Sequence, residues 1–303
     1  MNLILGLIER DIKDSINSDL QRLGVMYRLF SRVKEPESIA EKIGRKKYDE
    51  TGKKMQDIIG FRIVTYFYDD VKLLFDFFRK RLKEVGYEFD EAKTNVFEPL
   101  RKNLVCSFTG ENSIRFLDLL VTDPNYKLVD STFEIQFRTT FSEGWHEVEH
   151  NMRYKCKDEW TELTNEWRTL NGMYAVMETS DQALKGLFED ISYHHYKKKN
   201  WEGMLRNKFR LRFKMEDLSP EICKAFNGNN DLAKSIFKID RQKVLRAYID
   251  SGMVMQMSMN NLVFLLNHLK LKSKELESLT PQILKDDFST YFNESRSDEK
   301  SMR

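Results

Sequence analysis

Residues 31–66, SRVKEPESIAEKIGRKKYDETGKKMQDIIGFRIVTY, begin with a dense set of cations and then turn abruptly apolar. The apolar end has the composition of a buried β-strand, with Asp57 at its entrance and Arg62 inside it. An arginine in such a strand must reach a cleft or be paired, because an unpaired buried charge is costly. A second stretch, FEIQFRTTFSEGWHEVEH at 133–150, supplies another carboxylate, Glu134. Together these groups indicate polyphosphate and metal chemistry.

The length and charge of the chain narrow the kinds of protein that it can be. Its 303 residues are enough for one large domain or two modest ones. Charged residues make up 32% of the chain, but the formal net charge is only +2, so any basic site must be local. Three cysteines without CxxC spacing favour a reducing compartment, and no apolar stretch reaches the roughly 20 residues of a membrane span. We therefore expect a soluble cytoplasmic protein without a signal peptide.

The first part of the chain is predicted to alternate helices with one strand. Apolar residues at helical intervals predict an amphipathic helix over 7–31, which would deliver Arg32 and Lys34 to the edge of the core. The further predicted elements are a short helix over 37–43 starting near Pro36, a mobile loop at 44–56, a strand at 58–66, and a helix that begins at Asp69-Asp70 and is closed by Gly86.

The middle of the chain has the patterns of strands. An extended segment at 87–97 precedes runs at 104–108 and 114–121, which flank Gly110-Glu111-Asn112 and predict a β-hairpin. Residues 133–138 alternate apolar with polar side chains, which is the period of a strand with one polar face. That face carries three functional groups, Glu134, Gln136 and Arg138.

The rest of the chain is predicted to be helical almost throughout. One or two long helices are expected over 159–200, and we place a domain boundary near residue 200. Further features, in order, are a helix start at Ser219-Pro220, a turn at 227–230, helices at 231–251, 258–270 and 281–292, and a frayed polar end at 295–303.

The cations of the first stretch suit a flexible arm that wraps a polyphosphate. Lysine and arginine neutralise closely spaced negative charges, and arginine also binds bidentately and stacks on a base. The alternative is a solvated charged helix and loop, since the same stretch contains many acidic residues. The cations are Arg32, Lys34, Lys42, Arg45, Lys46, Lys47, Lys53 and Lys54.

Asp57 and Glu134 are candidate ligands of Mg²⁺, which takes one or two protein carboxylates together with the phosphates of a substrate. Two carboxylates on adjacent strands of one sheet can meet at the distance that such a site needs. The alternative is that Asp57 caps a strand or pairs with a lysine, and that Glu134 is an exposed residue paired with Arg138.

Two other motifs suggest different functions. HEVEH at 146–150 matches H-E-x-x-H, the signature of a zinc peptidase helix, but the flank NMRYKCKDEW offers no third ligand. His194-His195 precedes three lysines and is assigned to a basic helix C-terminus. Residues 207–214 alternate cations with aromatics, which suits RNA, but the strict alternation also fits a strand with Phe209, Leu211 and Phe213 packed inward.

Four ordered blocks of the chain resemble the synthetase domain of the RelA/SpoT alarmone synthetases. They are SRVKEPESIAEKI at 31–43, MQDIIGFRIV at 55–64 followed by YDDV, FEIQFRT at 133–139, and GWHEVEHNMRYK at 144–155. The resemblance covers about residues 20–157. It implies an α+β fold with a nucleotidyltransferase-like mixed β-sheet flanked by helices. We expect this synthetase domain over 1–200 and an all-helical C-terminal region over 201–303.

The activity that the resemblance implies is transfer of pyrophosphate from ATP to the 3′-hydroxyl of GDP or GTP, with Mg²⁺. It assigns Arg32 and Arg62 to a sandwich around adenine. Asp57 would be the principal metal ligand, and Glu134 would assist the metal or activate the attacking hydroxyl. His150 would support the strand that carries Glu134. The residues that would hold the ATP phosphates are Lys34, Lys42, Arg45 and Lys46.

The segment expected to bind the acceptor departs from the family pattern. The family has Gly-Tyr-x-x-x-His there, with the tyrosine stacked on guanine, whereas residues 95–103 read NVFEPLRKN. Phe97 would stack instead, and the further acceptor contacts would be Arg101, Asn103, Gln136 and Arg138.

The acceptor is therefore open between GDP, GTP, an adenine nucleotide and a tRNA 3′ end, the last in a toxin-like enzyme. A catalytically degenerate regulator that only binds nucleotides is the other alternative. The chain has no HxxHD-type hydrolase motif, so the resemblance implies a synthetase-only form. Assembly into a homo-oligomer is left open.

Overall fold

The strand predicted at 58–66 forms part of a five-stranded mixed sheet. The computed structural model describes residues 2–93, 96–214 and 216–293. In spatial order the strands are β1 (Tyr27–Val33), β2 (Ile59–Thr65), β5 (Thr132–Thr139), β4 (Lys102–Ser107) and β3 (Glu84–Phe89). β2 and β5 run parallel, and every other neighbouring pair is antiparallel. The predicted frayed end at 295–303 and part of the predicted extended segment, residues 94–95, lie outside the described residues.

One face of this sheet is apolar and the other is polar, as the alternation in residues 133–138 predicted. On β5, Phe133, Ile135 and Phe137 are buried, and the polar residues between them are half-buried. The apolar face packs on α4 (Tyr68–Arg81), where Phe75 contacts Phe137 with the ring centroids 5.5 Å apart. The polar face is therefore available for functional groups.

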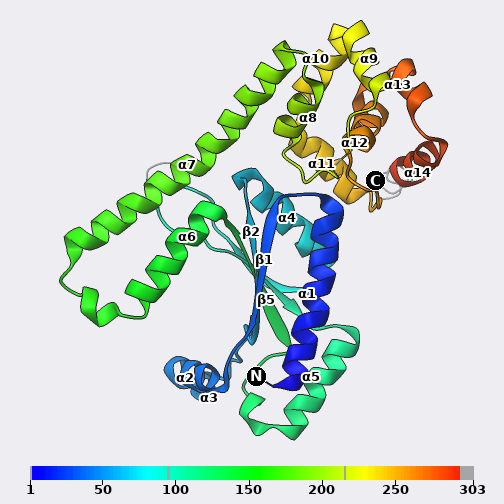
Figure 1. Cartoon of the computed structure of the whole chain (residues 1–303). Coiled ribbons are helices and arrows are strands. Elements are labelled where there is room, and N and C mark those ends of the chain that lie inside the picture. Colours follow the sequence, from blue (N-terminus) through cyan, green and yellow to red (C-terminus); the bar gives the residue numbers. More distant parts are fainter. Residues whose placement is uncertain (1, 94–95, 215, 294–303) are drawn as a thin grey trace, which may run out of the picture. The chain divides into compact units, whose positions relative to one another are not determined.

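Further helices surround the strands. They are α1 (Leu3–Leu23), α2 (Pro36–Lys46), α3 (Tyr48–Thr51), α5 (Gly110–Thr122) and α6 (Thr140–Glu149), which continues into a π-helical turn at His150–Tyr154. Figure 1 shows α1 and α5 on one side of the strands and α2, α3 and α6 on the other. Pro36 occupies the first position of α2, as predicted. The predicted fold class, a mixed sheet flanked by helices and followed by a helical region, is confirmed.

The helix predicted over 7–31 is wrong in its second half. α1 ends at Leu23, and Gly24 follows it in the left-handed backbone region, with a φ of 69°. Phe30 and Arg32 belong to β1 instead, where they share one strand face. Only Phe30 had been assigned to the helix, and its helical spacing from the residues of α1 was misleading, because pairing of β1 with β2 decided the conformation.

Two glycine-based predictions are also wrong. Gly86 does not close α4 but lies in β3, at a register shift against β4. The hairpin predicted around Gly110 is instead α5, whose buried side chains Phe116 and Leu119 are three residues apart. A short apolar run has no unambiguous period, so tertiary contacts decide between strand and helix. The loop predicted at 44–56 contains the end of α2 and the short helix α3.

The chain divides into two compact units. One consists of the described residues of 1–19 and 27–182, and the other of those of 20–26 and 183–303. The change from one unit to the other falls within α7 (Thr164–Lys197), which confirms the long helix predicted over 159–200. The predicted boundary near residue 200, as the limit of a separately folding domain, stays a prediction.

The second unit is helical beyond α7. Its helices are α8 (Trp201–Phe209), α9 (Pro220–Gly228), α10 (Asn230–Lys238), α11 (Arg241–Asp250), α12 (Met259–Leu266), α13 (Lys274–Leu279) and α14 (Gln282–Asn293). The single helix predicted over 231–251 is wrong, because the Asp240 carboxylate caps a new helix, α11. Phe209 and Leu211 are buried, which favours the inward packing of residues 207–214 over contact with RNA. In the described part of the chain, no helix is long and apolar enough to span a membrane.

A glycine in this second unit provides a test of its helix packing. Gly203 of α8 lies against α7, and a Cβ added to it would be 2.6 Å from Cγ of His195. We expect Gly203→Ala to lower the free energy of unfolding by about 1–3 kcal/mol, because overpacking displaces the neighbouring side chains. The control Gly186→Ala, whose added Cβ meets nothing within 4 Å, should be neutral or stabilising by up to about 1 kcal/mol. Equal denaturant midpoints for the two variants would contradict this packing.

Candidate functional site

Asp57 is held in place by the backbone on both sides of it. The Met55 amide donates a hydrogen bond to the Leu128 carbonyl at 2.9 Å, and the Lys34 amide donates to the Ile58 carbonyl at 3.0 Å. These bonds tie the entrance of β2 to the segment before β5 and to the chain that follows β1. The Asp57 side chain therefore has a defined position at the end of the sheet.

Two lysines neutralise the Asp57 carboxylate. Lys34 Nζ lies 2.5 Å from Oδ2, and Lys42 Nζ of α2 lies 2.7 Å from both carboxylate oxygens. Burial by itself would raise the pKa of Asp57, but the two ammonium groups outweigh burial and hold this pKa below its ordinary value. Asp57 is thus paired with lysines, and the phosphates of a ligand would compete for the same cations.

Glu134 lies on β5 in register with Gly60 of β2. Gln136 Nε2 donates a hydrogen bond of 3.0 Å to its carboxylate. Burial raises the pKa of Glu134 above its ordinary value, and the Asp57 carboxylate acts in the same direction. The predicted alternative, a pair with Arg138, is wrong, because Arg138 binds a glutamate of α6. Glu134 is therefore a carboxylate that takes up a proton more readily than an exposed one.

Arg62 emerges on the same polar face and is paired with α6. Its Nη1 lies 2.5 Å from a carboxylate oxygen of Glu143 and 2.5 Å from one of Glu147. Thr139 and Ser142 form a capping box that starts α6 directly after β5. Glu143 and Glu147, four residues apart, therefore lie on one helix face beside the sheet. The two glutamates raise the pKa of Arg62 although burial opposes them.

A pocket of about 510 Å³ opens on the polar face and is lined by both Arg32 and Arg62. Phe30 lies in register with Arg62 across β1 and β2 and is 49% exposed. Arg32 lies in register with Gly60, and a Cβ added to Gly60 would meet only Arg32 Cγ, at 4.0 Å. The missing side chain leaves open space between the strands. Both arginines line one pocket, and Arg62 is also ion-paired. Their predicted sandwich around adenine stays a prediction.

A second pocket, of about 370 Å³, adjoins the same carboxylates. It is lined by Lys42 and Tyr48 from the α2–α3 segment and by Glu88 and Asn103 from β3 and β4. Tyr87 also borders it, but the Tyr87 ring packs under α4, 4.0 Å from the Arg79 guanidinium. Both Asp57 and Glu134 line this pocket as well as the first one. Two carboxylates thus stand between two spaces of the size that binds parts of nucleotides.

A family model matches most of this arrangement. Residues 31–159 match the family described as a region found in RelA/SpoT proteins, and Phe30 lies just before the match. The chain is therefore similar to the RelA/SpoT family over this part of its length. Solved structures similar to the chain include a GTP pyrophosphokinase family protein from Streptococcus pneumoniae, with 21% identity over 63% of this chain and 96% of that chain and a TM-score of 0.47. Another is small alarmone synthetase 1 from Bacillus subtilis bound to its product pppGpp, with 22% identity over 61% and 93% and a TM-score of 0.47. No curated protein matches the chain.

Within the RelA/SpoT region, the predicted phosphate-binding residues divide into two groups. Lys34 lines the first pocket and Lys42 the second. Arg45 and Lys46 are exposed in the last turn of α2 and line neither of these two pockets. His150 follows α6 and stacks on the ring of the nearby Tyr154, and its supporting role for β5 stays a prediction.

The predicted acceptor-binding residues are scattered. Asn103 lines the second pocket and Gln136 the first. Phe97 is 52% exposed, Arg101 pairs with carboxylates of β3 and the loop after it, and neither residue lines these pockets. Arg138 lines neither of these two pockets and is paired with a glutamate of α6. The acceptor roles of these residues stay predictions.

The sequence analysis missed several residues of these pockets. Phe30 was assigned to a helix, although the alternation of apolar Tyr27, Leu29 and Val33 with Arg28 and Arg32 was a strand signal. The spacing of Glu143 and Glu147 on a predicted helix was a usable signal for a pair of carboxylates on one face. Tyr48 had no local signal, because only the fold brings α3 to the end of the sheet.

His146 and His150 do not form a zinc site. Burial and the nearby Arg138 lower the pKa of His146 to about 3, so this side chain is neutral and desolvated. No cluster of three or more His, Cys, Asp or Glu side chains suitable for a metal ion occurs among residues 2–93, 96–214 and 216–293. The zinc-peptidase alternative therefore has no support.

The depressed pKa of His146 predicts acid lability of the RelA/SpoT region. An unfolded histidine, with a pKa near 6.5, binds protons that the folded one rejects until its own pKa of about 3. The stability of the folded state is therefore not reduced by His146 above pH 6.5, and it falls as the pH decreases from 6.5 toward 3. Between pH 7 and pH 5, His146→Gln should lose roughly 1–2 kcal/mol less than the parent chain. Parallel loss in denaturant titrations of both proteins would contradict this assignment.

Proposed function

We propose that the chain is an ATP-dependent pyrophosphokinase that makes (p)ppGpp from ATP and GDP or GTP. The observation that carries this proposal is that Asp57 and Glu134 line both pockets at once. A group-transfer enzyme needs a donor site and an acceptor site that meet at the reacting atom. The match of residues 31–159 to the RelA/SpoT family supports the same assignment.

The first pocket suits the ATP donor. Arginine side chains are planar and stack on a base, and Arg32 and Arg62 both line this pocket. Phe30 adds an exposed aromatic ring beside them. Lys34, at the inner end of the pocket, supplies a positive charge for the phosphates. In this arrangement adenine binds near β1 and the phosphates reach toward Asp57.

The pair of carboxylates fits Mg²⁺, which usually takes one or two carboxylates and completes its shell with water and substrate phosphates. Asp57 and Glu134 are the residues that would hold it. When bound, the ion would neutralise charge on the transferred phosphates. The lysines that now pair with Asp57 are placed to move onto the phosphates when ATP occupies the site.

In the proposed reaction, the 3′-oxygen of the acceptor forms a bond to the β-phosphorus of ATP. The bond between that phosphorus and the oxygen bridging to the α-phosphorus breaks, and AMP leaves. Glu134 is placed to accept the hydroxyl proton, because its carboxylate lies where the two pockets meet. Lys34 and Lys42 stabilise the charge that is redistributed over the phosphates.

The second pocket suits the acceptor nucleotide. Tyr48 is the aromatic side chain that can stack on a base here, since the Tyr87 ring packs beneath α4. The Glu88 carboxylate now pairs with Arg101; once it exchanges that partner, it would accept hydrogen bonds from both N–H groups on one edge of guanine, a pair that adenine lacks. These contacts favour a guanine nucleotide and give Tyr48 the role that the sequence analysis assigned to Phe97.

A product assay tests the proposed function. ATP labelled in its β-phosphate is incubated with GDP, GTP, adenine nucleotides or total tRNA, and the label and AMP are followed. We expect the label on a guanine nucleotide with one AMP released per transfer. Label on tRNA alone would identify the toxin-like alternative, and ATP binding without AMP release in every arm would identify a nucleotide-binding regulator.

Replacing Asp57 should abolish transfer and spare the fold. Asp57→Asn keeps the size of the side chain but removes the charge that would hold the metal and orient the lysines. We expect the rate of AMP release to fall by at least about a hundredfold, the range seen when a charge-stabilising group is removed. The control Asp76→Asn removes a surface carboxylate that pairs with Lys72 at 3.5 Å, far from both pockets, and should keep full activity. Normal activity of a folded Asp57→Asn protein would refute the assignment.

The proposed stacking of Tyr48 on the acceptor base gives a separate prediction. Tyr48→Ala should raise the KM for GDP by roughly tenfold or more, since stacking on an aromatic ring contributes about 1–3 kcal/mol per base. The KM for ATP should not change, because Tyr48 does not line the first pocket. Phe97→Ala is the matched control and should leave both values unaltered. If Phe97→Ala raised the KM for GDP and Tyr48→Ala did not, Phe97 would be the residue that stacks on the acceptor base.

A further inference from the structure

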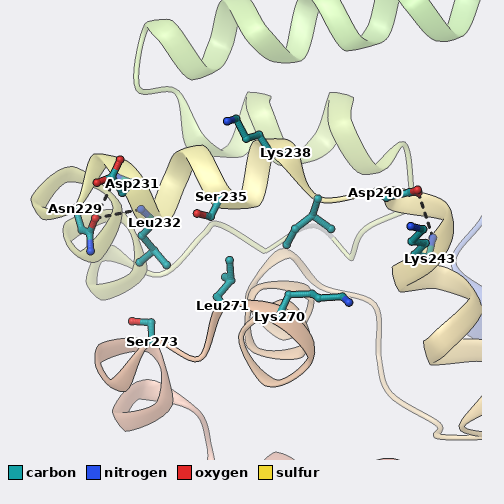
Figure 2. Close-up of a pocket in the computed structure, with 11 residues that line it drawn as sticks. Asn229, Asp231, Leu232, Ser235, Lys238, Asp240, Lys243, Lys270, Leu271 and Ser273 are labelled. Atoms are coloured by element: carbon teal, nitrogen blue, oxygen red, sulfur yellow. Dashed lines mark hydrogen bonds between the residues drawn. The ribbon is translucent and has the colours of Figure 1, made fainter.

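The second compact unit, called the helical unit below, contains a pocket whose lining includes neither Asp57 nor Glu134. Its volume is about 650 Å³, within the range of small-molecule sites. It lies between α10, the start of α11, the π-helical turn at Asn267–Leu271 and Ser273, which follows that turn, as Figure 2 shows. Nothing in the proposed transfer reaction uses this pocket.

Three lysines line the pocket, Lys238, Lys243 and Lys270. Within the described part of the chain, none of their ammonium groups has a hydrogen-bond or ion-pair partner. In Figure 2 the side chains of Lys243 and Lys270 lie on the same side of the pocket. Three lysines against the two aspartates Asp231 and Asp240 leave the lining with a formal charge of +1.

One of the two aspartates in the lining is already engaged. The Asp240 carboxylate accepts hydrogen bonds from the Gln242 and Lys243 amides and so caps α11. The other, Asp231, lies next to Asn229, at the opposite end of α10 from Lys238. These hydrogen bonds leave the Asp240 carboxylate charged, but the three lysines of the lining outnumber its two aspartates, so the net charge of the lining is positive.

A simpler explanation of these lysines is interaction with helix ends. Lys238 and Lys270 lie in the last turns of their helices, where cations are favourable. Lys243 does not fit this explanation, because it lies in the first turn of α11, where the helix dipole disfavours a cation. The N-cap carboxylate of Asp240 offsets this unfavourable effect in part.

The rest of the lining defines the body of the ligand. Leu232, Ile239 and Leu271 contribute apolar surface, and Ser235 contributes a hydroxyl. Among the described residues that line the pocket there is no aromatic side chain, so a nucleobase would have no ring on which to stack. Lysine binds phosphate as a point charge and needs no planar partner. We infer that the helical unit binds a phosphorylated small molecule with a non-aromatic body, such as a sugar phosphate.

Methyl NMR of the full chain tests this inference without relying on catalysis. Fructose 1,6-bisphosphate is the probe, added to protein labelled at isoleucine and leucine methyl groups. We expect saturable shifts at Leu232, Ile239 and Leu271. No shift at these methyls at millimolar probe, or shifts confined to Ile59 and Ile63 of the sheet, would overturn the inference.

Charge variants then assign the binding to the lysines. Lys243→Gln with Lys270→Gln should weaken probe binding at least tenfold, and Lys243→Arg with Lys270→Arg should retain it. Lys224→Gln with Lys234→Gln removes the same charge from exposed positions of α9 and α10 outside the lining and should bind normally. Equal weakening by both glutamine pairs would show that only net charge matters and would overturn the site. The methyl spectrum itself reports that each variant is folded.

Discussion

The parallel pairing of β2 with β5 is the contact on which the candidate site depends. It sets Gly60 beside Glu134 and Arg62 beside Gln136, so that the polar groups of both strands lie on one face. The other face is locked by aromatic packing against α4, as in the contact of Phe75 with Phe137. A register slip of one residue would turn the polar set of one strand into that apolar packing, which is strongly unfavourable. The burial of one face of the sheet thus determines the geometry of the other.

The site on that polar face is balanced internally. Asp57 is neutralised by Lys34 and Lys42, and Arg62 by two glutamates of α6. Such pairs offset the cost of desolvating the charges, and a charge left without its partner in a partly buried place is destabilising. A nucleotide with its metal would exchange these partners. The phosphates would replace Asp57 as the partners of the lysines, and the metal would replace the lysines as the partner of Asp57. Binding would then reorganise charge without creating unpaired groups.

The charged groups of the pocket in the helical unit are not paired in this way. Its lysines have no partner among the described residues, whereas its polar capping groups are occupied by helix amides. An anionic ligand would complete this pocket, while the two pockets of the RelA/SpoT region must first release internal partners. The chain thus combines a site whose charged groups would exchange partners with a pocket whose lysines have no partner among the described residues. The two lie in separately packed units.

Local sequence determined the elements whose patterns were unambiguous. The alternation of residues 133–138 defined a strand with one polar face, and the entrance of β2 with Asp57 and Arg62 marked the candidate site. The tertiary structure decided the rest. Phe30 became a strand residue because β1 pairs with β2, and the apolar run after Gly110 became a helix because Phe116 and Leu119 are buried together on one helix face. Tyr48 reached the second pocket only because α3 packs at the end of the sheet. A period or a motif is encoded by neighbours along the chain, whereas a pocket is formed by residues that only folding brings together.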